Sequence, residues 1–426
     1  MKNLTVAPIR KFSKSLVVPG DKSISHRAVM LGAVAKGKTE IRNFLLAEDC
    51  LHTLSAFKAL GIEGTFTGKG RLMLHGKGLR GLRRARRAIY LGNSGTSIRL
   101  LSGLLAGQPF ATTLTGDPSL SQRPMKRVIL PLEKMGATIA ARKGEFPPLT
   151  IRGGSLKAIC YRTPMPSAQV KSAVLLAALY AEGKTTLIEP FKTRDHTERM
   201  FREFGKPLSI EGLSISLVGG EELEGSKIEV PGDISSAAFF IVLASALEGA
   251  RVMVKDVGLN PTRTAFLNVL RRMGASLRLR ERRQQVRAGE PIGEIEVHGT
   301  SLHGTTVKAS EIPALIDELP ILMVAGACAD GRTLFQKASE LRVKETDRIH
   351  SMVTNLRKMG VSIWNERDNV IIEGGKPFYG AKVESFKDHR TAMSLAVAGR
   401  LARKGETTVQ DASCIQTSFP SFVKLI

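Results

Sequence analysis

Two cations and two hydroxyl side chains gather in residues 18–27, directly before an apolar stretch. Either Asp21 or Ser23 is suited to cap a helix that runs through residues 28–31, and the N-terminus of such a helix attracts anions. Lys22 and Arg27 add fixed positive charge beside this helix start. These residue types at this spacing predict a site for a phosphate or a carboxylate.

Other polar residues stand at the starts of predicted helices. Each alone is compatible with ordinary capping or with a solvated surface, but each start could also hold an anion through backbone N–H groups and side chains. The candidates are Asn93 and Gly95 in a glycine-rich turn, Arg123 before Pro124, and Ser167, Gln169 and Lys171 before an apolar helix.

The C-terminal half has three further candidates. Lys344 and Arg348 are four residues apart on one helix face, with Glu345 beside Arg348, although a solvated, salt-bridged helix has the same pattern. Asp317 interrupts an apolar run, so its carboxylate is either buried and paired or catalytic. His389 opens a long helix and could act as an acid or base, but a lone histidine is more often structural.

Composition limits the class of protein. A chain of 426 residues exceeds what one hydrophobic core usually serves, so we expect two domains, and 42% hydrophobic residues indicate a soluble globular protein. Four scattered cysteines without CxxC spacing argue against disulfides or zinc and favour a reducing cytoplasm. We expect no signal peptide and no membrane span.

The net charge of +24 indicates attraction to polyanions or to small, highly charged substrates. Two arginine clusters lie between predicted elements, and neither is interleaved with aromatic residues as in single-strand binders. The charge alone therefore does not predict nucleic-acid binding. The clusters are Arg80, Arg83, Arg84, Arg86 and Arg87, and Arg278, Arg280, Arg282, Arg283 and Arg287.

An internal repeat organises the chain. Six apolar helices each end near a glycine, which we expect to cap the helix, and each is followed by β-prone residues. An amphipathic helix and two more strands follow, so each unit of about 70 residues reads as strand, helix, strand, helix, strand, strand. The segment 4–18 is predicted to be a displaced strand pair that completes the sixth unit. The glycines are Gly37, Gly107, Gly183, Gly249, Gly331 and Gly405.

One motif match is rejected. Residues 32–39 satisfy the P-loop pattern GxxxxGK[ST]. A working P-loop follows a strand and opens a helix, whereas this segment ends a predicted helix and starts a strand. We therefore expect no nucleotide site there.

Taken in order, the motifs have a common source. Eight short motifs occur between Pro8 and Phe422, in the order PGDKSISHR, GNSGT, QRPM, SAQVKS, RDHTE, IDELP, RVKETDR and DHR. In this order they closely resemble the 5-enolpyruvylshikimate-3-phosphate synthases, more specifically the class II bacterial type.

The resemblance implies an α/β fold: a two-domain inverse α/β barrel with three βαβαββ repeats in each domain and a cleft between the domains. Residues 1–19 plus 232–426 would form one domain and residues 20–231 the other, with crossovers near 19–22 and 230–234. It further implies a monomeric cytoplasmic enzyme with no metal or cofactor, and with no nucleic-acid or membrane partner.

The implied reaction transfers the enolpyruvyl group of phosphoenolpyruvate to the 5-hydroxyl of shikimate 3-phosphate by addition and elimination, in the shikimate pathway. By this resemblance, Asp317, Glu345 and Lys22 are the catalytic candidates. The shikimate 3-phosphate contacts would be Lys22, Ser23, Arg27, Ser167, Gln169, Thr193, Asp317 and Lys344. The phosphoenolpyruvate contacts would be Lys22, Asn93, Gly95, Arg123, Gln169, Arg348, His389 and Arg390.

The sequence departs from the class I pattern at three positions, and three other functions each account for only part of it. Ala168 replaces the serine of the class I enzymes, Glu340 falls near their asparagine position, and Thr417 stands near their lysine. UDP-N-acetylglucosamine enolpyruvyl transferase shares the fold, but its loop carries a reactive cysteine that residues 119–124 lack. An RNA terminal-phosphate cyclase would need a nucleotide site, and a basic nucleic-acid-binding protein would leave the ordered motifs unexplained.

Overall fold

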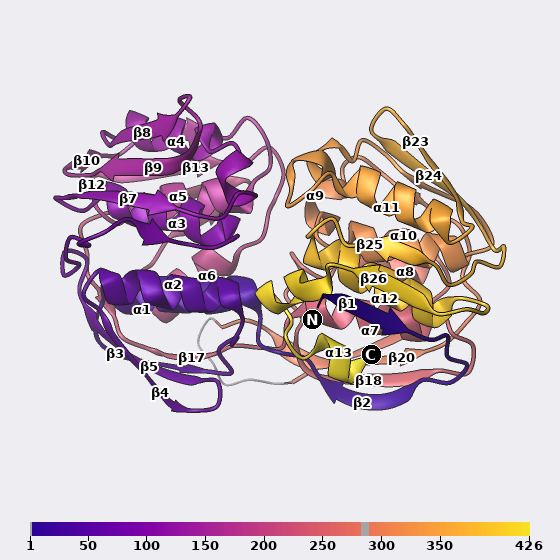
Figure 1. Cartoon of the computed structure of the whole chain (residues 1–426). Helices are drawn as coiled ribbons and strands as arrows, with labels where there is room; N and C mark the ends of the chain where they lie inside the picture. Colours follow the sequence, from indigo (N-terminus) through magenta and orange to yellow (C-terminus); the bar gives the residue numbers. More distant parts are fainter. Residues whose placement is uncertain (1, 283–288) are drawn as a thin grey trace. The chain divides into compact units, whose positions relative to one another are not determined.

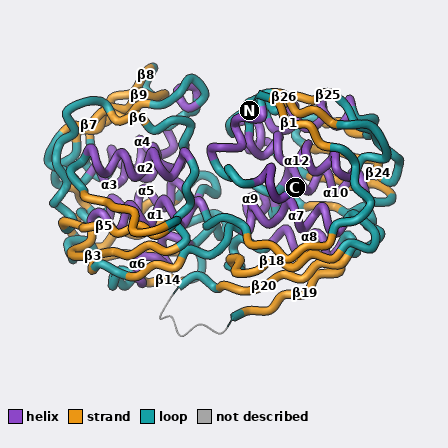
Figure 2. Tube along the Cα trace, turned by 60° about the horizontal axis from the view of Figure 1, so that its bottom comes forward, coloured by secondary structure: helices purple, strands orange, loops and turns teal. Residues whose placement is uncertain are grey.

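The computed structural model describes residues 2–282 and 289–426 (Figure 1). The chain divides into two compact units, each with its own hydrophobic core. The first comprises Met1–Pro19, Pro231–Gln284 and Pro291–Ile426, and the second comprises Gly20–Val230 and Gln285–Glu290. Within each unit the strands lie at the outside and the long helices lie between the sheets (Figure 2).

Among the described residues, three sheets of four or five strands surround the helices of the second unit, and in each a central strand pairs in parallel along one edge and antiparallel along the other. The first contains β3 (Ala35–Arg42), β4 (Glu63–Gly68), β5 (Arg71–Lys77), β16 (Leu223–Glu224) and β17 (Lys227–Glu229). The second contains β6 (Ile89–Tyr90), β7 (Ala111–Thr115), β8 (Thr138–Arg142) and β9 (Phe146–Arg152). The third contains β11 (Cys160–Arg162), β13 (Lys184–Ile188), β14 (Ser209–Glu211) and β15 (Ser214–Val218), and β10 (Leu156–Lys157) pairs with β12 (Ala181–Glu182).

The helices of this unit are of two kinds. Three are buried almost all round, as their continuous apolar sequences predict: α1 (Lys22–Val34), α3 (Gly95–Ala106) and α5 (Ala168–Ala178). A Cβ on Gly103 would lie 2.2 Å from the carbonyl oxygen of Ala173, so glycine permits the close packing of α3 on α5. The others are α2 (Glu48–Ala59), α4 (Lys126–Lys134), α6 (His196–Glu203) and the 3₁₀ turn η1 (Leu120–Gln122).

The first unit repeats this arrangement with three sheets. One contains β2 (Ser13–Val17), β18 (Arg251–Gly258), β19 (Ser276–Glu281) and β20 (Ile292–His298). Another contains β21 (Thr306–Val307), β22 (Gly331–Phe335), β23 (Ser362–Glu366) and β24 (Asn369–Gly374), and the last contains β1 (Asn3–Val6), β25 (Lys382–Glu384) and β26 (Thr407–Gln410). The helices are α7 (Ile234–Ser245), α8 (Ala265–Arg272), α9 (Ile312–Leu315), α10 (Leu319–Cys328), α11 (Arg348–Lys358), α12 (His389–Leu401) and α13 (Phe422–Leu425), with η2 (Ser339–Val343) and η3 (Ala412–Thr417).

The two N-terminal strands do not act as a pair. β1 lies antiparallel to β26 and completes the sheet of the last repeat, as expected. β2 instead runs parallel to β18, with Leu16 opposite Val254, and joins a different sheet. The prediction that both strands complete the sixth unit is therefore wrong for β2, because local sequence reports that a strand forms but not which edge it will join.

The glycines after the buried helices also differ from expectation. Of the six predicted capping glycines, only Gly107 occupies the C-cap position of its helix, and its φ of −87° is not left-handed. After α1 the cap is Ala35, which is already extended, and the positive φ comes at Gly37, inside β3. These glycines therefore serve mostly the turn into the next strand rather than the helix end. The P-loop-like segment 32–39 accordingly runs from α1 into β3, which is the reverse of a phosphate-binding loop.

The second arginine cluster is not wholly between elements, because Arg278 and Arg280 lie on β19. Arg283 and Arg287 lie outside the described residues. The first cluster does lie in the connection between β5 and β6, where Arg80 donates to the carbonyl of Gly107 at 3.3 Å.

Candidate active site

The predicted anion site at residues 18–27 is the start of a capped helix. Asp21 is the N-cap of α1, because its carboxylate accepts from the N–H of Ile24 at 2.9 Å. Lys22 is the first helical residue, and its Nζ lies 3.0 Å from Oδ2 of Asp49 on α2. The lysine keeps 17% of its side chain exposed, so the ion pair holds it without burying it completely.

Arg27 is buried one turn further along α1. Its guanidinium donates to Thr197 Oγ1 at 2.7 Å, to Ser172 Oγ at 2.8 Å and to the carbonyl of Ser23 at 2.9 Å. Burial lowers the pKa of Arg27 to about 10, so the side chain stays charged at neutral pH. The result is a fixed positive charge that neutral hydroxyls orient.

The glycine-rich turn before α3 brings a second arginine into place. Ser94 caps α3 by accepting from the N–H of Ser97 at 3.1 Å. Asn93 donates to Asp117 at 2.7 Å and accepts from the Arg123 guanidinium. A Cβ on Gly95 would lie 3.0 Å from guanidinium nitrogens of both Arg123 and Arg99. A small residue at this helix start therefore leaves room beside two arginines.

The start of α5 adds polar groups to the same surroundings. Ser167 is the N-cap, accepting from the N–H of Val170 at 3.3 Å. The amide of Gln169 accepts from Arg99 at 2.7 Å and donates to Thr96 Oγ1 at 3.0 Å. Gln169 thus joins α5 to the first turn of α3, and Arg99 lies between them.

A buried ion cluster holds the segment that carries Thr193. Lys171 on α5 lies 3.0 Å from Glu189 and 2.7 Å from Glu198, and all three side chains are 3% exposed or less. Lys171 also donates to the carbonyl of Thr193 at 3.3 Å, while the Thr193 hydroxyl donates to Glu189. Burial raises the pKa of Glu198, and the lysine ammonium opposes that rise. Lys171 therefore supports Thr193 rather than facing a ligand.

Replacing Lys171 by methionine is expected to lower the free energy of unfolding by about 3 kcal/mol, because two carboxylates would remain buried without their cation. Denaturant unfolding would measure this change. Lys206→Met is the matched control: Lys206 is 1% exposed, but its partner Glu221 is 65% exposed and can be hydrated after the change. Equal losses in the two variants would contradict the assigned role of the cluster.

In the other unit, Arg348 is the centre of the charged residues at the starts of α11 and α12. Its side chain is 1% exposed, and it donates to Asp388 at 2.9 Å and to Glu345 at 2.5 Å. A third nitrogen lies 3.6 Å from Asp317. Burial alone would lower the pKa of Arg348, but Asp388, Glu345 and Asp317 together raise it. Three carboxylates thus fix one permanently charged guanidinium.

Asp317 lies between two arginines. Arg390 reaches its carboxylate at 3.3 Å and donates to its backbone carbonyl at 2.8 Å. The Asp317 side chain keeps 18% of its surface exposed, whereas the neighbouring Glu318 is 1% exposed and accepts from Ser235. The two acids of the apolar run therefore separate into an accessible carboxylate, Asp317, and a buried structural one, Glu318.

Lys344 and His389 complete this group. Lys344 Nζ lies 3.9 Å from Glu340. Burial lowers the pKa of Lys344 to about 8, although Asp317, Glu340 and Glu345 act in the opposite direction. His389 is the first residue of α12 and is 5% exposed, directly after the N-cap Asp388. Asp388 accepts from the N–H groups of Arg390 and Thr391, so one carboxylate both caps α12 and orients Arg348.

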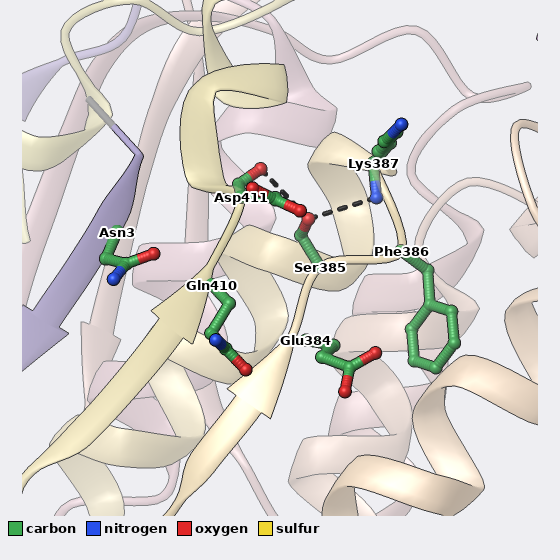
Figure 3. Close-up of a pocket in the computed structure, with 7 residues that line it drawn as sticks. All are labelled: Asn3, Glu384, Ser385, Phe386, Lys387, Gln410 and Asp411. Atoms are coloured by element: carbon green, nitrogen blue, oxygen red, sulfur yellow. Dashed lines mark hydrogen bonds between the residues drawn. The ribbon is translucent and has the colours of Figure 1, made fainter.

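A cavity of about 460 Å³ lies beside this group, at the ends of β25 and β26 (Figure 3). Seven residues line it, and none is a predicted substrate contact: Asn3, Glu384, Ser385, Phe386, Lys387, Gln410 and Asp411. Among these lining residues, Ser385 donates to the carbonyl of Asp411 and accepts from the N–H of Lys387, both at 3.0 Å.

The predicted residues therefore fall into one group in each unit. Lys22, Ser23 and Arg27 share α1 in the second unit, where the starts of α3 and α5 supply Asn93, Gly95, Ser167 and Gln169, and the segments before α4 and α6 supply Arg123 and Thr193. In the first unit Asp317, Lys344, Glu345, Arg348, His389 and Arg390 lie around the starts of α10, α11 and α12. Within residues 2–282 and 289–426 no group of acidic, histidine and cysteine side chains is arranged to hold a metal, and no helix is long and apolar enough to cross a membrane.

The capped helix starts, the buried arginines and the two α/β units are the features of an enzyme for small anionic substrates. Comparison with known proteins specifies the family. The family model for EPSP synthase (3-phosphoshikimate 1-carboxyvinyltransferase) matches residues 6–426. A 3-phosphoshikimate 1-carboxyvinyltransferase from Geobacter sulfurreducens is 49% identical over 100% of this chain and 99% of its own, and one from Desulforamulus reducens is 48% identical over 98% and 97%.

A solved EPSP synthase from Acinetobacter baumannii superposes with a TM-score of 0.88 at 47% identity, covering 100% of this chain and 97% of that chain. The chain therefore belongs to the EPSP synthase family, and its predicted α/β fold and enzyme class are confirmed. Family membership therefore favours this enzyme class over the alternatives of a UDP-N-acetylglucosamine enolpyruvyl transferase and an RNA terminal-phosphate cyclase.

Several residues of these groups were not predicted as site residues. Each of three such residues holds a predicted site residue in place: Asp49 holds Lys22, Arg99 holds Gln169, and Asp388 holds Arg348. Asp388 stands inside the quoted motif DHR and Arg99 lies three residues after GNSGT, so their proximity in sequence was a signal. Nothing local marks Asp49 as the partner of Lys22, 27 residues away.

Proposed function

We propose that the charged groups of both units act on the same two substrates, phosphoenolpyruvate and shikimate 3-phosphate. Each substrate carries a carboxylate and a phosphate, and a phosphate monoester holds about −1.5 to −2 charges at pH 7. Bringing two such anions together requires fixed cations, which Lys22, Arg27, Arg123, Arg348 and Arg390 supply. The observation that carries the proposal is the match of the EPSP synthase family over residues 6–426.

Shikimate 3-phosphate would be held mainly by hydroxyl, amide and lysine groups. Ser167 caps a helix and so keeps a backbone N-terminus beside its hydroxyl, a combination suited to phosphate. The proposed contacts are Lys22, Ser23, Arg27, Ser167, Gln169, Thr193, Asp317 and Lys344. Ala168 lacks the hydroxyl that class I enzymes place there, so the phosphate would rely more on Ser167 and Gln169.

Phosphoenolpyruvate would be held mainly by arginines, whose planar guanidinium groups suit bidentate contacts with carboxylate and phosphate. The proposed contacts are Lys22, Asn93, Gly95, Arg123, Gln169, Arg348, His389 and Arg390. Arg123 and Arg348 are each oriented by neighbouring side chains before any ligand binds, which reduces the ordering cost of binding.

The reaction would proceed by addition and elimination. C3 of phosphoenolpyruvate is protonated, positive charge develops at C2, and the 5-hydroxyl adds there. Loss of a C3 proton and of phosphate then gives the enol ether. Asp317 is proposed as the base for the 5-hydroxyl, because its carboxylate is accessible between two arginines. Glu345 and Lys22 are proposed for proton transfer at C3 and to the leaving phosphate.

Release of inorganic phosphate from the two substrates tests this proposal. We expect release only when phosphoenolpyruvate and shikimate 3-phosphate are both present. A folded protein that releases no phosphate from the pair, or that hydrolyses either substrate alone at the same rate, would contradict it. We also propose that the enzyme is a cytoplasmic monomer that needs no cofactor and binds neither nucleic acid nor membrane. Sedimentation of the active protein would test the monomer.

The lowered pKa of Lys344 leads to a pH-dependence. As pH rises through about 8 the ammonium of Lys344 loses its proton, so kcat/KM for shikimate 3-phosphate is expected to fall about tenfold between pH 7 and 9.5. The second ionisation of the substrate phosphate, with a pKa of about 6, is largely complete by pH 7 and does not cause a fall above it. Because the folded-state pKa lies below the unfolded value, deprotonation removes a destabilising contribution, so unfolding is not the cause of the fall.

Lys344→Arg is the control for this pH-dependence. An arginine stays charged throughout the range, so the variant should keep a flat profile above pH 8 even if its overall rate is lower. An identical decline in both proteins would assign the titration to another group.

A further inference from the structure

A chain of four buried polar side chains crosses three helices of the unit that begins at Gly20. His26 Nδ1 on α1 lies 2.7 Å from Thr53 Oγ1 on α2, and Thr53 Oγ1 lies 2.7 Å from Ser97 Oγ on α3. Ser97 in turn donates to Ser94 Oγ, the α3 cap, at 2.6 Å. All four residues are 1% exposed or less. We call this chain the His26 relay.

Counting protons fixes the direction of every bond in the relay. A hydroxyl has one proton, and that of Ser97 is given to Ser94. Thr53 Oγ1 also lies 3.4 Å from the carbonyl of Asp49, but its 2.7 Å contact with Ser97 Oγ is much shorter, so the proton between Thr53 and Ser97 comes from Thr53. Thr53 has none left for His26, so the imidazole must donate through Nδ1–H. The His26 ring is therefore the Nδ1–H tautomer, and the hydrogen bonds run from α1 through α2 to the cap of α3.

The charge state of His26 agrees with this count. Burial, followed by the nearby charges of Lys22 and Arg27, lowers the pKa of His26 well below its ordinary value. The ring is thus neutral at pH 7, and among the described residues its Nε2 has no hydrogen-bond partner. A histidine that donates through one nitrogen only, in a fully buried place, is not being used as an acid or a base.

The relay has a second connection beside it. Lys22 and His26 are one turn apart on α1, and their partners Asp49 and Thr53 are one turn apart on α2. The connection between His26 and Thr53 continues to α3, through Ser97 to Ser94. Asn93 and Gly95, the neighbours of Ser94 in the sequence, are both proposed phosphoenolpyruvate contacts. The relay thus joins the helix that carries Lys22 and Arg27 to that turn.

We propose that His26 is a positioning residue for enolpyruvyl transfer: through Thr53 and Ser97 it fixes helix α1, with Lys22 and Arg27, against the turn at Asn93 and Gly95. This inference rests on the proposed function of these groups. Apolar side chains would fill the same space but would not specify the register of three helices, whereas hydrogen bonds have defined lengths and directions. Catalysis is sensitive to displacements of about 1 Å, at a cost of about 10²-fold in rate.

Substitutions at both ends of the first bond test the inference. His26→Phe and Thr53→Val break the relay and should lower kcat by about 10²-fold. His26→Asn keeps an N–H donor near the position of Nδ1, and Thr53→Ser keeps the hydroxyl, so both should retain kcat within about threefold of wild type. Thr185→Val is the matched control: Thr185 is fully buried in the same unit, and its hydroxyl has no partner among the described residues.

The comparison separates positioning from stability. If both variants are folded at the assay temperature, as their melting curves would show, and only Thr53→Val lowers kcat, the relay positions the site. Wild-type kcat in folded Thr53→Val, or no rescue by Thr53→Ser, would overturn the inference. Nitrogen-15 NMR of the wild-type protein is independent of every variant: protonated Nε2 in His26 would contradict the relay. Wild-type protein without phosphate release would instead overturn the proposed function.

Discussion

Lys22→Met is expected to lower kcat/KM by about 10⁴-fold, the largest loss of any single change proposed for this chain. Methionine keeps the length of the side chain but removes the ammonium that would contact both substrates and assist departure of phosphate. The loss is expected in turnover as well as in binding, because charge on the leaving phosphate develops only in the transition state. Initial rates of phosphate release over a range of concentrations of each substrate would measure both kcat and kcat/KM.

The control for Lys22→Met is the same change at an exposed position. Lys36 on β3 lies 3.9 Å from Glu222, and its side chain is 67% exposed. Lys36→Met should leave the rate unchanged, since exposed pairs contribute little. A Lys22→Met protein that folds and turns over like Lys36→Met would remove Lys22 from the mechanism.

Asp317→Asn is expected to lower kcat by about 10³-fold with a smaller effect on the KM of either substrate. An amide keeps the shape of the carboxylate but cannot accept the proton of the 5-hydroxyl. It also stops neutralising Arg348 and Arg390, both of which lie within 3.6 Å of the Asp317 carboxylate. Single-turnover measurements would separate the chemical step from binding.

Glu373→Gln provides the comparison for Asp317→Asn. Glu373 pairs with Arg332 at 2.7 Å on the surface of β24, away from the charged helix starts. This variant should match wild type. A KM increase without a change in kcat in Asp317→Asn would show that Asp317 binds substrate but is not the base.

Local chemistry made the helix starts predictable from sequence. Asp21, Ser94, Ser167 and Asp388 cap α1, α3, α5 and α12, and a cap depends only on the next few residues. The sequence left Asp21 and Ser23 as alternative N-caps of the first helix, and in the structure the N-cap is Asp21. The order of motifs identified the family because each motif keeps a charged or hydroxyl group at such a start.

Contacts between distant segments were not predictable in the same way. Arg27 donates hydrogen bonds to Ser172 and Thr197, which are 145 and 170 residues away in the sequence, and no local sequence pattern predicts these contacts. The partner of β2 was predicted wrongly for a related reason. β2 pairs with β18, but two exposed strand edges look alike in sequence, so the sequence does not show which edge the strand joins. The His26 relay likewise needed the packing of α1, α2 and α3, because serine and threonine inside helices are common without any such chain.

Transfer of the enolpyruvyl carbons is the central claim, and carbon-13 NMR tests it most directly. Phosphoenolpyruvate labelled at C2 and C3 would be mixed with shikimate 3-phosphate and the wild-type protein. We expect both labelled carbons to appear in an enol ether on the 5-oxygen of shikimate 3-phosphate, with one phosphate released for each transfer. Labelled pyruvate with free shikimate 3-phosphate, or no change in the labelled carbons, would contradict the account.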